Sequence, residues 1–197
     1  MDGSVYEYQP SFILGFHGCD KSTADKILSG QDPHLTPSQK AYDWSGHGIY
    51  FWEGNLARAW DWAHARKAEG KLAEPAVLGA IIDLRHCLDL FDLNAMNQVR
   101  ATHAALVDMF AAADTPLPIN VGPTPDKAGR KLDCAVLNAL HELCQDNNQT
   151  PYDSVRGPFL EGDPIYEGAG FRSHSHIQIC VRSNTCIKGY FRTIHPA

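Results

Sequence analysis

Short apolar runs at both ends of the chain predict β-strands. They contain the aromatic and β-branched residues that are enriched in strands, and turn-forming residues bound them. The run at 76–84 is continuously apolar, which is typical of a strand buried on both faces. In chain order, the predicted strands span residues 12–16, 49–51, 76–84, 154–160, 177–181 and 187–194.

Two helices are predicted in the first part of the chain. Asn55 is a favourable N-cap, and apolar positions recur after it with helical spacing until Gly70 ends the helix. A shorter helix covers residues 24–28, where Ser22 or Thr23 has a side chain suited to capping the first turn. Both helices lie between predicted strands, so helices and strands alternate in this part.

The middle of the chain predicts a pair of helices. Residues 93–113 have helical composition, and a second helix follows a proline- and glycine-rich loop at 120–129. The pair forms an insertion at about residues 92–147, and a long loop is expected at 31–48. Together these elements predict an α+β fold in a single domain over residues 1–197.

Composition limits the class of protein. The 197 residues are 44% hydrophobic and 20% charged, which suffices for one buried core. No apolar run approaches the roughly 20 residues that a membrane-spanning helix needs, so we expect no membrane insertion. The six cysteines lack the paired spacing of a metal site, and no apolar leader precedes them. We therefore expect reduced thiols, no bound metal and a cytoplasmic location.

The net charge of −6 argues against a large nucleic-acid surface, because such a surface normally needs a basic face. It leaves room for a local basic groove. The residues that would form such a groove are Arg130, Lys131, Arg156, Arg172 and Arg182.

Three short segments far apart in the chain carry candidate chemistry. A His-Gly-Cys segment at 17–19 follows the first predicted strand, and a Gly-Ile-Tyr-Phe segment at 48–51 runs from a turn into the second. Gln178 lies near the start of a late strand. Taken singly, these residues fit a surface histidine, a packed aromatic strand and a solvent-facing glutamine. Their types and order together favour one shared site.

In type and order these segments resemble the catalytic core of the ADP-ribosyltransferases, on the poly(ADP-ribose) polymerase and diphtheria-toxin side of that superfamily. Relatives carry a His-Tyr-Glu triad, and this chain would carry a His-Tyr-Gln variant. The resemblance implies an ADP-ribosyltransferase-like fold, in which a split pair of twisted antiparallel sheets surrounds a cleft for NAD.

The resemblance also implies residue roles. His17 would donate a hydrogen bond to a ribose hydroxyl, and the Gly18 backbone would pair with the nicotinamide carboxamide. The Tyr50 ring would stack on the nicotinamide, whose positive charge gains about 1 kcal/mol or more from a desolvated aromatic face. Trp62 would close the other face, and Ala59 stands where relatives place a serine that binds the carboxamide.

Gln178 falls where relatives place their glutamate. Its amide oxygen can accept a hydrogen bond from the ribose 2′-hydroxyl but cannot take up a proton, which disfavours chain elongation. His176 lies two residues earlier on the same strand face and is a candidate base, because free imidazole titrates at about 6.5. The acidic residues Glu161, Asp163 and Glu167 either include a group that helps deprotonate an acceptor or form a solvated loop.

The expected function is mono-ADP-ribosylation, with NAD as substrate and a protein, nucleic acid or small molecule as acceptor. The resemblance associates such enzymes with toxins and defence effectors, for which an antitoxin or immunity protein would be the partner. Two alternatives remain open. One is an NAD glycohydrolase, and the other is a non-catalytic module that binds NAD or ADP-ribose.

Overall fold

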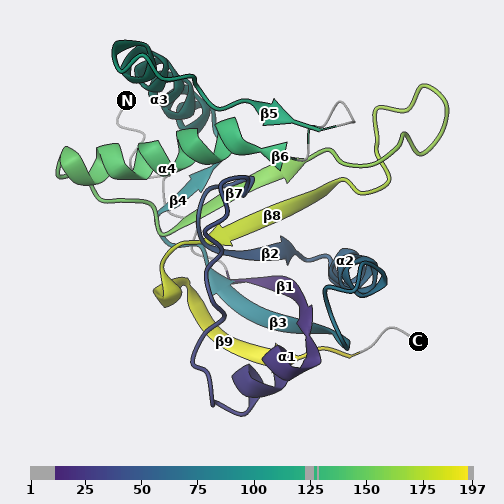
Figure 1. Ribbon diagram of the computed structural model, residues 1–197. Helices are drawn as coiled ribbons and strands as arrows, with labels where there is room; N and C mark the ends of the chain where they lie inside the picture. The colour runs from purple at the N-terminus through teal and green to yellow at the C-terminus, as the bar shows by residue number, and fades with distance from the viewer. Residues whose placement is uncertain (1–11, 123–126, 128, 195–197) are drawn as a thin grey trace.

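The computed structural model describes residues 12–122, 127 and 129–194. Within these residues, seven strands form one sheet in the order β4-β7-β8-β2-β1-β3-β9, and four α-helices lie against it (Figure 1). The elements are β1 (Phe12–Asp20), α1 (Lys21–Leu28), β2 (Ile49–Glu53), α2 (Leu56–Ala68), β3 (Pro75–Asp83), β4 (Cys87–Asp89), α3 (Leu93–Ala112), β5 (Asn120–Val121), β6 (Gly129–Arg130), α4 (Lys131–Asp146), β7 (Ser154–Phe159), β8 (His176–Val181) and β9 (Ile187–Arg192).

The α+β class predicted from the sequence is confirmed. The sheet differs from the expected pair of antiparallel sheets in two ways. It is continuous, because β1 and β2 remain paired over a short stretch. It is also mixed, because β4 joins its edge parallel to β7.

Strands β1 and β2 pair over a short stretch and then part, which forms a fork in the sheet. The ladder between them holds two residue pairs, at Gly15 and Phe16, whereas β1 stays paired with β3 over nine residues. Gly15 permits the close approach, since a Cβ there would lie 2.5 Å from Ile82 Cδ1 and 2.8 Å from Phe51 Cβ. Beyond Phe16 the β1–β2 ladder ends, so the two halves of the sheet are free to part.

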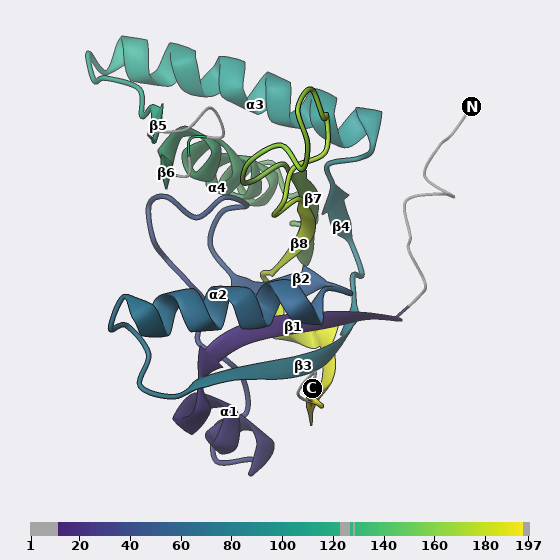
Figure 2. The same ribbon diagram turned by 90° about the vertical axis from the view of Figure 1, so that its right-hand side faces the viewer.

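Helices cover both faces of the sheet. On β3, the neighbouring residues Val77 and Leu78 point to opposite faces, and they belong to different core clusters. Val77 packs with residues of α2, and Leu78 packs with residues of α1. The α3–α4 pair lies over the β7–β8 side of the sheet, apart from α2 (Figures 1 and 2). The sheet therefore has two separate helical covers on one face.

Helix capping follows the sequence in one case and departs from it in the other. Asn55 accepts a hydrogen bond from the Arg58 backbone N–H at 2.9 Å, and Gly70 adopts a positive φ of 72° after α2, as predicted. The cap of α1 is Asp20, not Ser22 or Thr23, so that prediction is wrong. One Asp20 oxygen caps α1 and the other accepts from two backbone N–H groups before β3, a long-range role that local pattern does not reveal.

The two inserted helices occur where they were predicted. Between them, the expected loop at 120–129 begins and ends in the short β5–β6 pair, and residues 123–126 and 128 lie outside the described part of the chain. Strand β4 was also not predicted, because three residues are too few to show an alternating pattern.

Candidate active site

A cleft of about 350 Å³ opens where β1 and β2 part, on the face of the sheet that α2 and α4 cover separately. It has contributions from β1, β2, α2 and β8, from the loop between α1 and β2, and from the start of the β7–β8 connection. Five residues predicted from the sequence line this one cleft: His17, Gly18, Tyr50, Trp62 and Gln178.

His17 bridges the fork in the sheet. Its Nδ1 lies 2.7 Å from the Tyr50 carbonyl oxygen, and because a carbonyl only accepts, Nδ1 is assigned as the N–H donor. Burial lowers the pKa of His17 below its ordinary value, which favours the neutral ring. Its Nε2 is then an acceptor, so a ligand hydroxyl would donate to it. This reverses the direction expected from the sequence, in which His17 donates.

Gly18 is required by the packing of β1 on α2. A Cβ at this position would lie 2.8 Å from both the Ala59 carbonyl oxygen and Trp62 Cε3. Ala59 itself is fully buried, so its small side chain lets the strand and the helix approach. The bare backbone of Gly18 thereby becomes part of the cleft wall.

Three aromatic side chains form one side of the cleft. Tyr50 and Trp52 alternate on β2 and point to the same face, and Trp62 on α2 meets Trp52 with ring centroids 5.8 Å apart at 53°. The Tyr50 hydroxyl donates to the Gly46 carbonyl at 2.5 Å and accepts from the Ser45 N–H at 2.9 Å. Trp52 was not predicted as a site residue, although its alternation with Tyr50 was a visible signal.

Cationic side chains line the same space. Arg58 lies 5.6 Å from the Trp52 ring and Arg66 lies 5.2 Å from the Trp62 ring, both on α2, and Lys40 comes from the α1–β2 loop. The sequence pattern did not single out these three as site residues. Arg58 pairs with Glu161 and Asp61, and Arg66 pairs with Glu69 at 2.8 Å.

Gln178 lies on β8 directly opposite Trp52 of β2. Directly paired residues of neighbouring strands share one face of a sheet, so both side chains face the cleft. Gln178 is half-buried there. The glutamine amide is thus close to the aromatic side of the cleft, as the residue order predicted.

His176 does not line the cleft, contrary to its predicted role as an acceptor base. Its side chain is 1% exposed and lies between Phe159, with ring centroids 5.7 Å apart, and Trp52, at 6.2 Å. Nδ1 lies 2.6 Å from the His174 carbonyl oxygen, and burial lowers the pKa of the ring. A side chain enclosed in this way cannot contact an acceptor, so its role is to support Trp52.

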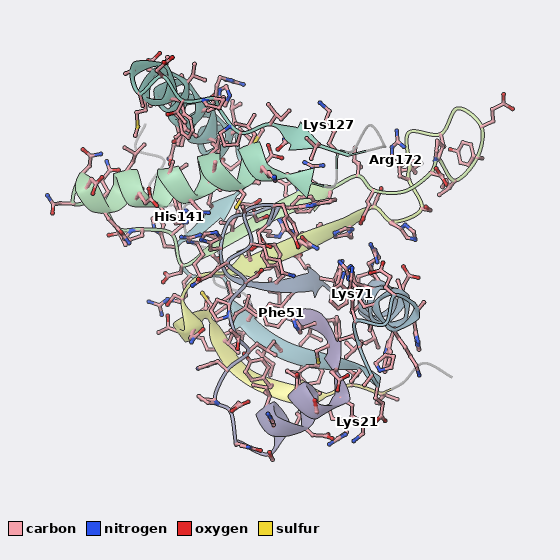
Figure 3. The ribbon with its side chains drawn as sticks, viewed as in Figure 1. Lys21, Phe51, Lys71, Lys127, His141 and Arg172 are labelled. Atoms are coloured by element: carbon pink, nitrogen blue, oxygen red, sulfur yellow. The ribbon has the colours of Figure 1, made fainter. Side chains whose placement is uncertain are left out.

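Of the three acidic residues in the β7–β8 connection, Glu161 lines the cleft, whereas Asp163 and Glu167 are exposed. Glu161 Oε2 lies 2.8 Å from Arg58 Nη2. The connection itself projects away from the sheet, and Arg172, labelled in Figure 3, marks its position. Glu161 therefore belongs to the base of this projection rather than to its tip.

The basic groove considered from the sequence is not assembled at the cleft. Arg156 pairs with Glu53 and Asp89, at 2.6 and 3.1 Å. Arg182 donates to the His47 carbonyl, and Arg172 donates to the Gly162 carbonyl. These arginines make structural contacts, and none of them lines the cleft.

The likeness of this chain to known proteins is partial. No protein-family model matches the chain, and no solved structure matches it. The chain is similar to an uncharacterized protein of Methanocaldococcus jannaschii, with 30% identity over 95 residues. The matched stretch is 48% of this chain and 41% of the relative, so the chain spans less than half of that protein's length.

Three further observations bear on metal binding, membrane insertion and the cysteines. In residues 12–122, 127 and 129–194, no three His, Cys, Asp or Glu side chains come together in a way that would hold a metal ion. None of the helices that the structure describes has the length and apolar character needed to cross a bilayer. All six cysteines are free thiols, and five of them are buried.

Proposed function

We propose that the cleft binds NAD and that the protein cleaves the nicotinamide–ribose bond and transfers a single ADP-ribose to an acceptor. The observation that carries the proposal is the meeting of His17, Tyr50 and Gln178, from three neighbouring strands, in one cleft. The same three residues form the His-Tyr-Gln variant of the triad that the sequence resembles. The parting of β1 and β2 at this point also supports an ADP-ribosyltransferase-like arrangement.

The chemistry of the cleft suits the parts of NAD. Its volume of about 350 Å³ lies within the usual range for small-molecule sites, roughly 300 to 1,000 Å³. The nicotinamide ring, which is positively charged, would lie against Tyr50 and Trp62. Lys40 and Arg66 provide positive charge for the pyrophosphate, and His17 Nε2 would accept from a ribose hydroxyl.

Bond cleavage proceeds by loss of neutral nicotinamide, which takes the bonding electron pair and leaves an oxocarbenium-like ribose. Gln178 would hold the ribose through its 2′-hydroxyl, because the amide oxygen is an acceptor. Aromatic stacking and fixed dipoles can stabilise this transition state without any proton transfer. The neutral glutamine is therefore compatible with cleavage, and the acceptor's proton must go elsewhere.

The proposal predicts that the intact protein releases nicotinamide from NAD and that Gln178→Ala slows the release. Loss of one hydrogen bond to the neutral 2′-hydroxyl removes about 0.5–1.5 kcal/mol, which corresponds to roughly 2- to 12-fold in rate. Nicotinamide release is measured by chromatography. The matched control is Gln149→Ala, an exposed glutamine after α4, which should keep the wild-type rate.

An intact protein that releases no nicotinamide with any acceptor would remove the enzymatic proposal. Calorimetric NAD binding without turnover would then favour a non-catalytic module.

A second activity, NAD glycohydrolase, is favoured by one observation, the glutamine at position 178. In that reaction water is the acceptor, and water is small and needs no recognition site. This activity predicts free ADP-ribose and no labelled macromolecule from adenylate-labelled NAD.

A further inference from the structure

The cleft contains one carboxylate that is placed to take up a proton. Among the described residues, the acidic side chains that line it are Asp43 and Glu161. Both oxygens of Asp43 are engaged within their own loop, since Oδ1 accepts from Ser38 Oγ at 3.0 Å and Oδ2 accepts from the Lys40 N–H at 2.9 Å. Asp43 is therefore a structural acceptor, which leaves Glu161.

Glu161 is held by one of its two oxygens. In the described part of the chain, its contacts with Arg58 Nη2, at 2.8 Å, and with His176 Nδ1, at 3.8 Å, both use Oε2. Oε1 is left for a molecule in the cleft, and the side chain is 26% exposed. Arg58 is itself fixed, because it also pairs with Asp61 at 3.1 Å and is 12% exposed. The carboxylate is thus oriented without being closed off.

The backbone at Glu161 is also fixed. Its carbonyl accepts from the His174 N–H at 2.9 Å, which joins the two ends of the β7–β8 connection. Gly162 follows with a positive φ of 85°, and a Cβ there would collide with Ser173. These contacts form a narrow neck at the base of the projection, so Glu161 stays beside the cleft whatever the tip of the connection binds.

We propose that Glu161 is the catalytic base that deprotonates the acceptor, in place of the glutamate that Gln178 replaces. This inference rests on the proposed function. As the nicotinamide–ribose bond breaks, nicotinamide leaves with the electron pair. The acceptor's oxygen or nitrogen then bonds to the ribose carbon, and the proton it loses passes to Glu161 Oε1. Arg58 positions the carboxylate.

The test uses methanol as the acceptor probe and azide as a rescue probe. Methanol must lose a proton when it attacks, whereas azide is an anion with no proton to lose. General base catalysis contributes roughly 10²- to 10⁴-fold, so Glu161→Gln should lower methyl ADP-ribose formation from NAD at least about 100-fold. Azide should restore turnover in that variant by forming ADP-ribosyl azide. Asp163→Asn, an exposed carboxylate in the same connection, is the control and should behave as wild type.

Glu161→Asp provides a second measurement, because it keeps a carboxylate at shorter reach. It should retain part of the methanol transfer and gain nothing from azide. A Glu161→Gln variant that keeps wild-type transfer, or a folded variant that azide does not rescue, would overturn the assignment while leaving the proposed function intact. A wild-type protein that cleaves no NAD would instead overturn the proposed function, and the base assignment with it.

Discussion

At the scale of single residues, one imidazole supports the geometry of the cleft. His17 donates to the Tyr50 carbonyl at the point where the β1–β2 ladder has ended, so a side chain supplies the next hydrogen bond between these strands. The ring is half-buried and lies 5.8 Å from Phe51. The same residue that would meet the ligand therefore also stabilises the fork that makes room for it.

A second histidine, His141, makes stability depend on pH. It is buried on α4, and burial followed by the charge of Arg182 lowers its pKa to about 4. In the unfolded chain the His141 side chain has a pKa of about 6.5. Between about pH 4 and pH 6.5, the unfolded chain therefore binds a proton at His141 that the folded chain does not bind. Stability is full above about pH 6.5 and falls as the pH drops toward 4, by on the order of 3 kcal/mol.

The free energy of unfolding in urea is measured at about pH 7 and at about pH 5. We expect the difference between the two values to be smaller in His141→Gln than in the wild type. His17 and His176, whose pKa values burial also lowers, remain in the variant and keep part of the dependence with the same sign. His103→Gln, on α3, is the control. An unchanged slope in the His141 variant would contradict the assignment.

The sequence predicted site residues that stand in or beside short sequence motifs. It was less informative about residues whose place in the cleft depends on how distant strands and loops pair. Tyr50 and Gln178 stand at strand positions that the apolar pattern predicted, and His17 follows directly after the strand predicted at residues 12–16. The cleft position of Trp52 depends on its pairing with Gln178, and that of Glu161 on the neck at Gly162. Neither contact exists until distant segments pair, so neither residue could be selected with certainty beforehand.

At the scale of elements, the sequence predicted the helices and the longer strands, whereas the short strands β4, β5 and β6 were not predicted. All four helices that the structure describes were anticipated. The helical spacing of apolar residues predicted α4, whereas capping and helix-ending residues predicted α1, and composition predicted α3. Strand β1 extends to Asp20, beyond the predicted end at residue 16, because pairing with β3 continues through Gly18 and Cys19. Because β1 continues beyond the fork, His17 still belongs to the strand and lines the cleft.

The fork itself depends on a glycine. Gly15→Ala would place a Cβ 2.8 Å from Phe51 Cβ, which cannot move without displacing β2. Overpacking of this kind costs about 1–3 kcal/mol, and we expect a corresponding loss in the free energy of unfolding, measured with denaturant. Gly189→Ala, on β9 with open space at its Cβ, is the matched control and should stay near wild type. Equal stability of both variants would contradict a tight crossing.

At the scale of the whole molecule, the cleft lies between two helical covers on one face of a single sheet. It draws on α2, on the loop before β2 and on the neck of the β7–β8 connection, which belong to separate parts of the chain. A ligand that contacts all of them should stabilise the folded state as a unit. Binding to the folded state alone adds about 2.7 kcal/mol at 100 times the dissociation constant.

Two tryptophans on α2 separate a ligand effect from a packing effect. Trp62 lines the cleft, whereas Trp60 stacks on His64 at 5.6 Å and does not line it. We expect NAD to raise the melting temperature of the wild type and of Trp60→Leu, and to have much less effect on Trp62→Leu. Thermal scans with and without NAD measure this. A shift that both variants retain would place the ligand elsewhere.

A phenylalanine ring at position 50 could stack as a tyrosine ring does, but it would lack the hydroxyl that hydrogen-bonds to Ser45 and Gly46. The Tyr50 hydroxyl donates to the Gly46 carbonyl and accepts from the N–H of Ser45, which is fully buried. Burial raises the pKa of Tyr50, so the hydroxyl keeps the proton that it donates. Removing that oxygen would leave the buried Ser45 N–H without this acceptor, at a cost of about 1–3 kcal/mol, and would leave the Gly46 carbonyl with the weaker donor Cys180 Sγ at 3.7 Å. Under the proposed function, position 50 therefore has to meet two independent requirements, one for the ring and one for the oxygen.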